Sequence, residues 1–223
     1  MATENQKKIK ILKDGPYEVS GNVPLSRAQY VPDTRGNSLR YEKTEKYVPQ
    51  DEPYHLCRCG HSSHKPYCDG SHLKGFNGTE TASHKKYDDM ADYIEGKQLD
   101  LMDARELCAA ARFCDTSGGT WDLVVNSEST EGKEIAVYQC ENCPSGRLTA
   151  VEKNGKKIEP KLPQEINVIE DVAAQIHGPL WVKGGIEITD ANGKPYPVRN
   201  RVTLCRCGKS RNKPFCDGHH MER

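Results

Sequence analysis

The chain has 223 residues, of which 35% are hydrophobic and 29% are charged. This composition leaves little apolar material for one large core, and ten cysteines and eight histidines suggest that bound metal holds small lobes together. The 32 basic and 32 acidic residues balance, which argues against nucleic-acid binding as the main task.

The first part of the chain predicts short strands joined by turns. Residues 1–6 are polar and lack the apolar core of a signal peptide. Strands are expected at residues 9–12 and 17–23, on either side of a Gly-Pro turn. The polar stretch 26–50 predicts an excursion or long loop. A further strand is expected to end at residues 54–57.

Three cysteines and one histidine follow that strand within sixteen residues. They are Cys57, Cys59, Cys68 and His72. The first two cysteines are two residues apart, so on a regular strand both side chains point to one face. Gly60 permits a close backbone approach to a metal centre. Pro66 fits the start of a helix, which would place the third cysteine and the histidine on one helical face.

The middle of the chain predicts a linker and then a different lobe. Residues 73–89 are polar and are predicted to be a linker. Residues 93–101 suggest a short hairpin, and Asp103 to Glu106 resembles a capping box that opens a helix through about Arg112. Further apolar segments lie at 121–125 and 135–138, and the mixed stretch 156–177 is expected to be a tether.

Four more cysteines lie in this middle lobe. They are Cys108, Cys114, Cys140 and Cys143. Their spacing suits a four-cysteine zinc site, a cubane-type cluster or two disulfides. No stretch reaches the roughly 18 apolar residues of a membrane helix. We therefore expect a cytoplasmic protein with no membrane contact, and a reducing compartment makes disulfides the least favoured of the three options.

The C-terminal part repeats the first motif with the same spacing. The repeated residues are Cys205, Cys207, Cys216 and His220. The repeat is longer than the ligands, because the lead-in at residues 178–184 matches residues 15–21. The alternation at 186–198 predicts a small β-lobe around a hairpin turn. Three cysteines and one histidine also suit structural zinc, so ligand type alone leaves the metal open.

Both copies fit the pattern C-x-C-x2-S-x3-P-x-C-D-G-x-H and resemble the CDGSH (NEET) iron–sulfur family. His219 replaces the serine of the literal signature in the second copy, without changing a ligand. The resemblance implies two [2Fe–2S] clusters, one on Cys57, Cys59, Cys68 and His72 and one on Cys205, Cys207, Cys216 and His220. A histidine ligand raises the reduction potential relative to all-cysteine ligation, and it can couple reduction to protonation.

The middle lobe resembles the divergent single-cluster ferredoxin domains of bacteria. The matching pieces are residues 93–101, Cys108-x5-Cys114, Trp121 and residues 143–148. The resemblance implies a third cluster, [4Fe–4S] or [3Fe–4S], held by Cys108, Cys114 and Cys143. Cys140 departs from the pattern, and it either completes a four-cysteine site or lies beside a three-cysteine one.

Together these features predict an α+β, β-rich chain of small lobes. We expect CDGSH lobes at 9–72 and 178–220 that form an intramolecular pseudo-dimer, with a ferredoxin-like α+β segment at 88–152 beside or between them. No nucleotide-phosphate loop, Ser-His-Asp arrangement or flavin fingerprint occurs, so we expect no enzyme.

The expected function is electron transfer or iron–sulfur cluster transfer. The partner would be a redox or cluster-acceptor protein, and the chain itself a monomer with an internal pseudo-two-fold. The alternative is a structural zinc scaffold that presents a surface to a partner.

Overall fold

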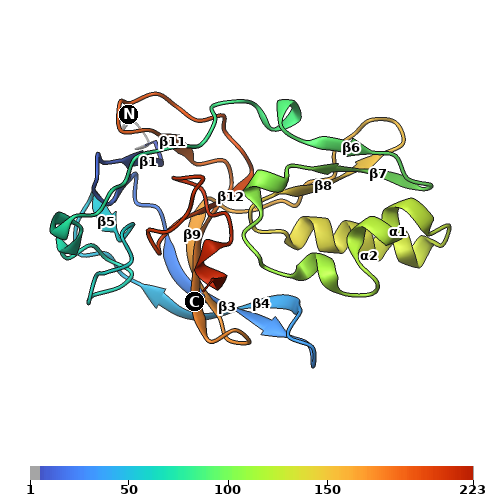
Figure 1. The fold of residues 1–223 in the computed structure, drawn as a ribbon, viewed down its shortest axis with the longest axis horizontal. Helices are drawn as coiled ribbons and strands as arrows, with labels where there is room; N and C mark the ends of the chain where they lie inside the picture. The colour runs from blue at the N-terminus through green and yellow to red at the C-terminus, as the bar shows by residue number, and fades with distance from the viewer. Residues whose placement is uncertain (1–5, 223) are drawn as a thin grey trace, which may run out of the picture.

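The computed structural model describes residues 6–222, in which three β-sheets and two α-helices are joined by short 3₁₀ turns. Figure 1 shows two parts side by side, a larger β-rich part and a smaller part that contains both helices. The strand orders are β11-β1-β2-β5, β12-β10-β9-β3-β4 and β6-β7-β8. No helix among residues 6–222 is long and apolar enough to cross a membrane. The fold is therefore β-rich and α+β, as the sequence predicts.

The twelve strands are β1 (Lys8–Ile11), β2 (Tyr17–Ser20), β3 (Leu25–Pro32), β4 (Ser38–Tyr47), β5 (Tyr54–Leu56), β6 (Asp92–Ile94), β7 (Leu99–Asp103), β8 (Leu148–Glu152), β9 (Glu165–Asp171), β10 (Ile176–Lys183), β11 (Glu187–Thr189) and β12 (Arg201–Leu204), counted over residues 6–222. The two α-helices of that range are α1 (Thr120–Asn126) and α2 (Thr130–Asn142).

The larger part of the molecule has two halves, residues 8–72 and residues 165–220, and each half adds a strand to the sheet of the other. Strand β1 pairs with β2 of its own half and, in parallel, with β11 of the other half, so that Ile9 lies opposite Ile188. Strand β9 likewise pairs with β10 and, in parallel, with β3, so that Ile166 lies opposite Leu25. All four side chains are buried in one shared hydrophobic core. Each half therefore completes the sheet of the other.

The prediction of a long loop at residues 26–50 is wrong. The stretch forms a hairpin in which β3 and β4 pair antiparallel. Strand β4 lies at the sheet edge and is mostly exposed, so its side chains are polar and give no alternating signal. Lys43 of β4 donates to Glu165 of β9 at 2.8 Å, which ties the hairpin to the second half.

The prediction of a tether at residues 156–177 is also wrong in part. Residues 165–171 form β9, an interior strand between β10 and β3. Six of its seven residues are buried, so both faces are covered and the period-2 pattern of a half-exposed strand is missing. Pro160 and Pro163 precede the strand and do not interrupt it.

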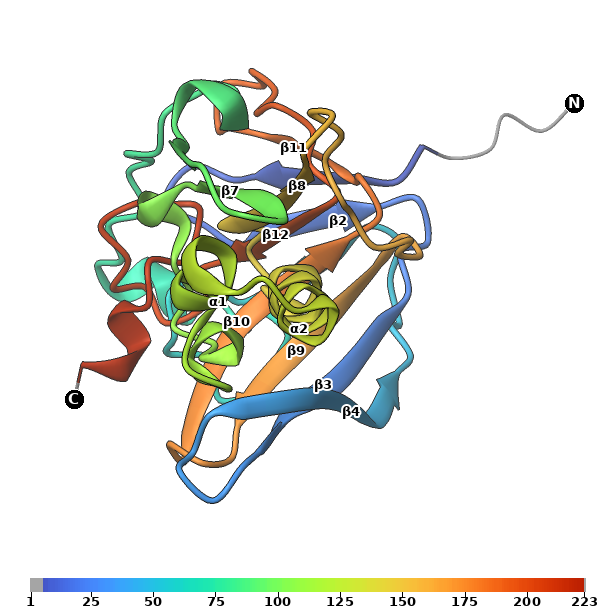
Figure 2. The ribbon, with the colours of Figure 1, turned by 90° about the vertical axis from the view of Figure 1, so that its right-hand side faces the viewer.

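The smaller part contains the sheet β6-β7-β8 with α1 and α2 packed against it (Figure 2). The predicted hairpin at 93–101 is confirmed, because Ile94 lies opposite Leu101. The predicted helix at 103–112 is absent, and a 3₁₀ turn at Arg105–Leu107 takes its place. Positive φ angles at Ala110 and Arg112 are incompatible with a right-handed helix. The apolar segments 121–125 and 135–138 lie in α1 and α2.

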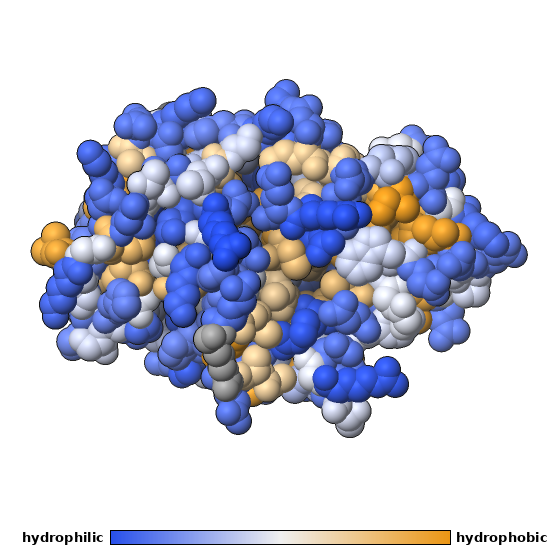
Figure 3. Space-filling model, in the orientation of Figure 1, coloured by the Kyte–Doolittle hydropathy of each residue, from blue (hydrophilic) through white to orange (hydrophobic). Residues whose placement is uncertain are grey.

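The two parts meet along a seam that carries apolar side chains. Figure 3 shows a mostly hydrophilic face on which apolar residues gather along this seam and over the smaller part. Across the seam, Tyr41 of β4 donates to the Asn142 carbonyl oxygen at 2.6 Å. Buried Arg201 of β12 donates to the Cys140 carbonyl oxygen at 3.0 Å. The end of α2 is thus fixed to strands from both halves.

Candidate metal centres

The first predicted ligand set lies where β5 ends, and its four side chains form two pairs. The sulfurs of Cys57 and Cys59 are 3.8 Å apart, and the Cys68 sulfur is 3.3 Å from Nδ1 of His72. Two ligands of one tetrahedral metal with bonds of about 2.3 Å to sulfur lie about 3.7 Å apart. Each pair therefore has the spacing of two ligands on one metal atom.

A turn, rather than the predicted helix, brings Cys68 to His72. Tyr67 forms an antiparallel bridge with Leu56, and Gly70 has a φ of +85° that ends any regular helix. The Asp69 carboxylate accepts hydrogen bonds from the backbone N–H groups of residues 63 and 71, at 2.8 and 3.0 Å. Hydrogen bonds from these two serines lower the pKa of Asp69. The helix prediction at this motif is wrong, although the two ligands meet.

The second predicted set repeats this geometry. The Cys205 and Cys207 sulfurs are 3.7 Å apart, and the Cys216 sulfur is 3.4 Å from Nδ1 of His220. Asp217 accepts from the backbone N–H groups of residues 211 and 219 at 2.8 and 3.1 Å, as Asp69 does in the first set. The identical sequence spacing therefore gives both motifs the same arrangement, a Cys–Cys pair and a Cys–His pair.

Among residues 6–222, no three or more Cys, His, Asp or Glu side chains are arranged to hold a single metal ion. Each CDGSH-type set brings its four ligands together as two close pairs. Two pairs of ligands suit a centre with two metal atoms.

The two sets have equal numbers of buried ligands, two in each, and differ in the electrostatics around them. The Cys207 thiol and nearby backbone N–H groups donate to Cys205 and lower its pKa to about 6, against the opposing effect of burial. Burial lowers the pKa of the free His220 imidazole to about 4. In the first set, burial raises the pKa values of Cys59 and Cys68. In the second set, the hydrogen bond with Cys205 and burial raise the pKa of Cys207, and burial raises that of Cys216. Of the second set, Cys205 and His220 are thus the two ligands whose pKa shifts favour the metal-binding form.

The two sets meet through a pair of glycines. A Cβ atom on Gly60 would lie 2.6 Å from the Cys207 carbonyl oxygen, and one on Gly208 would lie 2.5 Å from that of Cys59. Both glycines have positive φ, +83° and +77°. The sequence pointed to Gly60 for a close approach to metal. The structure shows that the close approach is to the backbone of the other motif.

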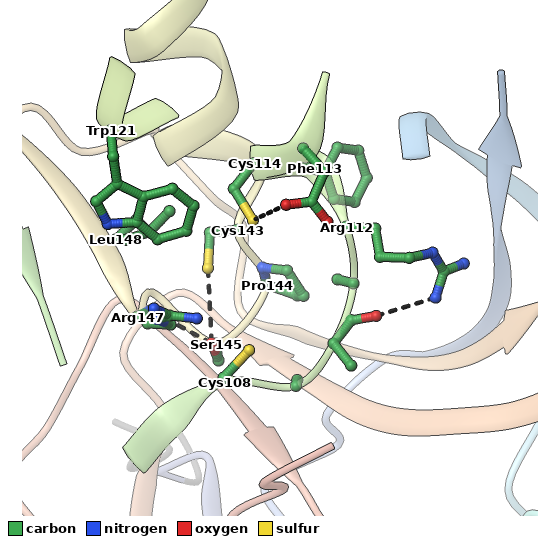
Figure 4. Close-up of a pocket in the computed structure, with 14 residues that line it drawn as sticks. Cys108, Arg112, Phe113, Cys114, Trp121, Cys143, Pro144, Ser145, Arg147 and Leu148 are labelled. Atoms are coloured by element: carbon green, nitrogen blue, oxygen red, sulfur yellow. Dashed lines mark hydrogen bonds between the residues drawn. The ribbon is translucent and has the colours of Figure 1, made fainter. Parts of the chain in front are cut away.

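Three of the four middle cysteines line one cavity of about 270 Å³. Figure 4 shows the sulfurs of Cys108, Cys114 and Cys143 directed toward the same space. Cys140 lies on α2, is fully buried in the small hydrophobic core, and is not among the cavity-lining residues. The three thiols and the room between them fit a cluster, whereas Cys140 packs behind Cys114 and Cys143 in the small core and does not line the cavity.

Arg147 covers the cavity beside these thiols and was not singled out from the sequence. It donates to Asp103 at 2.6 and 2.9 Å, and its guanidinium lies 5.1 Å from the centre of the Trp121 ring. Asp103 and, more weakly, Cys108 raise the pKa of Arg147. A fixed positive charge therefore faces the thiols of this site.

Replacing Arg147 with glutamine should lower the reduction potential of a cluster in this cavity, because a nearby positive charge stabilises the reduced form. Glutamine keeps a donor for Asp103. Spectroelectrochemical titration of the loaded chain measures the change, and Arg147→Lys, which keeps the charge, is the matched control. An equal shift in both variants would show that the charge is not responsible.

Two further buried arginines lie between the paired cysteines. Arg58 donates to the Gly78 carbonyl oxygen at 2.6 Å, and Arg206 donates to the Gly178 carbonyl oxygen at 2.6 Å and to Glu170 at 2.9 Å. Each holds a distant segment against its motif. Their presence at the same position in both copies is the sequence signal that would have found them.

Comparison with known protein families agrees with this geometry. Residues 14–73 and 177–221 each match the family described as iron-binding zinc finger CDGSH type. Two segments of the chain, which together span a little less than half of it, are therefore of the CDGSH type. Residues 94–153 match a second family, described as divergent 4Fe-4S mono-cluster. This tandem CDGSH protein is therefore an iron–sulfur protein whose two CDGSH segments flank a 4Fe-4S segment. Searches of curated proteins and of solved structures gave no match.

Proposed function

We propose that this chain carries electrons, iron–sulfur clusters or both, and has no enzymatic activity of its own. Two [2Fe–2S] clusters would lie on the two sets of three cysteines and one histidine, and a third, [4Fe–4S] or [3Fe–4S], in the cavity of Cys108, Cys114 and Cys143. The observation that carries the proposal is the division of each CDGSH set into two ligand pairs. When bound, such clusters exchange single electrons.

Iron and sulfide analysis with Mössbauer spectroscopy tests the proposal. Two [2Fe–2S] clusters contribute four irons, and the third adds three or four more, by cluster formula. The chain should be red-brown and should bleach on reduction. A colourless chain that contains zinc would instead support a structural scaffold.

We infer that the two CDGSH halves form the intramolecular counterpart of a dimer, with the 4Fe-4S segment beside them in a ferredoxin-like arrangement. The exchanged strands β1 and β3 and the reciprocal contacts of Gly60 and Gly208 support this inference. The chain would then act as a monomer with an internal pseudo-two-fold. Its partner would be a redox or cluster-acceptor protein. The ten cysteines are all free in residues 6–222, which suits a reducing cytoplasm.

Acid should release the second [2Fe–2S] cluster only in strongly acidic solution. Protonation removes a histidine ligand, and burial lowers the pKa of His220 to about 4, so the solution must be about that acidic to protonate it. Visible absorbance against pH measures this in a chain from which the first CDGSH set has been removed. His220→Cys should move the loss to still lower pH, and loss of the parent cluster near neutral pH would contradict the prediction.

A further inference from the structure

The second CDGSH motif touches the segment that carries the third cluster site. A Cβ atom on Gly218 would lie 3.2 Å from Cβ of Ala110 and 3.3 Å from the Cys108 carbonyl oxygen. Gly218 is two residues from both Cys216 and His220, which are ligands of the second set. Backbone from one ligand set is thus in van der Waals range of backbone from the other.

Further contacts fix this junction. The Asn212 amide, inside the second motif, donates to the Glu106 carbonyl oxygen at 3.0 Å. Arg112, between the cysteines at 108 and 114, donates to Asp171 of β9 at 2.8 Å. The junction is held from both sides.

The first CDGSH motif has no such contact at the matching position. Gly70 has φ and ψ of 85° and −3°, against 83° and −3° for Gly218, yet a Cβ atom on Gly70 would meet nothing within 4 Å among the described residues. His64 occupies the position of Asn212, and its side chain is 80% exposed. The first motif instead meets the second through Gly60 and Gly208. The three sites therefore lie in a row with the second CDGSH set in the middle.

We propose that the second CDGSH site is the central member of a three-site electron relay, entered from the third site at the contact of Gly218 with Cys108 and Ala110. This inference rests on the proposed function. When clusters are bound, Cys108, Cys114 and Cys143 would hold the donor, which would be oxidised by one electron. The acceptor on Cys205, Cys207, Cys216 and His220 would be reduced by that electron. Histidine ligation raises the reduction potential of the second site relative to an all-cysteine site, which favours electron transfer in this direction. A reduced one-electron carrier protein of the iron–sulfur or flavin class restores the third site.

The arrangement is tested by electron paramagnetic resonance of the loaded chain reduced with dithionite. The signal of the third site should relax faster because a second paramagnet lies beside it. Removing the second cluster with Cys205→Ala and His220→Ala should abolish the effect, whereas Cys57→Ala with His72→Ala should preserve it. The relay would be overturned if removing the first cluster abolished the faster relaxation while removing the second preserved it, or if both removals reduced it equally.

Iron analysis of the same samples distinguishes failure of the relay from failure of the proposed function. A chain that never loads a third cluster overturns both the proposed function and the relay. A chain that loads all three, but shows no interaction between the third site and the second, overturns the relay alone.

The junction is tested with a matched pair of glycine variants. Gly218→Val places a side chain against Ala110 and should slow the transfer from the third site to the second several-fold after flash reduction. Gly70→Val imposes the same backbone strain where there is free space, and it should leave that rate unchanged. Equal rates in the two variants would overturn the role of the junction. The resonance measurement on the parent chain remains decisive if Gly218→Val does not fold.

Discussion

Replacing Gly60 with alanine is expected to lower the free energy of unfolding by about 2 to 5 kcal/mol. An L-residue in the left-handed region costs about 1 to 2 kcal/mol, and overpacking against rigid backbone adds about 1 to 3 kcal/mol. The new Cβ would lie 2.6 Å from the Cys207 carbonyl oxygen, at a φ of +83°. Gly208→Ala should have a similar effect, because its Cβ would meet the Cys59 carbonyl oxygen at 2.5 Å. Urea-induced unfolding of the loaded chain measures both changes.

Gly70→Ala is the matched control for this prediction. Gly70 has a φ of +85° but nothing within 4 Å of the added Cβ, so only the backbone strain of about 1 to 2 kcal/mol remains. The difference between Gly60→Ala and Gly70→Ala therefore isolates the contact between the two motifs. If the two variants lost the same stability, the close approach would contribute nothing, and the paired arrangement of the halves would lose its main support.

The CDGSH ligands were identifiable from the sequence because their positions are fixed locally. Within each motif, the ligand pairs are two and four residues apart, and short turns close them. The strand pairings that join the two motifs were not identifiable, because they involve residues far apart in the chain. Residues 25–30 pair with residues 166–171, and β4 at the outer edge is too polar to give an alternating pattern.

Both mistaken helices were predicted from local helix-start features that other contacts override. Near Cys68, Tyr67 forms a bridge with Leu56, and Gly70 has a left-handed φ of +85°. Arg112, with a φ of +60°, donates to the Gly36 carbonyl oxygen at 3.0 Å. Local propensity is a weak influence that such contacts override. The stretch after Cys108 therefore forms an irregular loop, and its residues 108–115 line the cavity.

Cys114→Ala is expected to abolish the third cluster, whereas Cys140→Ala should retain it. Cys114 lines the cavity together with Cys108 and Cys143, but Cys140 does not. The Cys140 side chain is fully buried against Leu101 and its apolar neighbours, so truncating it should cost only about 1 kcal/mol of stability. Iron per chain and the resonance signal of the third site measure the outcome.

The same pair of variants decides how many thiolates hold the third cluster. If Cys140→Ala keeps its iron, three protein thiolates suffice, and any fourth iron of a cubane must take a ligand other than a cysteine of this cavity. Equal iron loss in Cys114→Ala and Cys140→Ala would instead make Cys140 a ligand. The Cys140 sulfur would then have to turn toward the cavity, which it does not line, although Cys114 and Cys143 pack against the same small core.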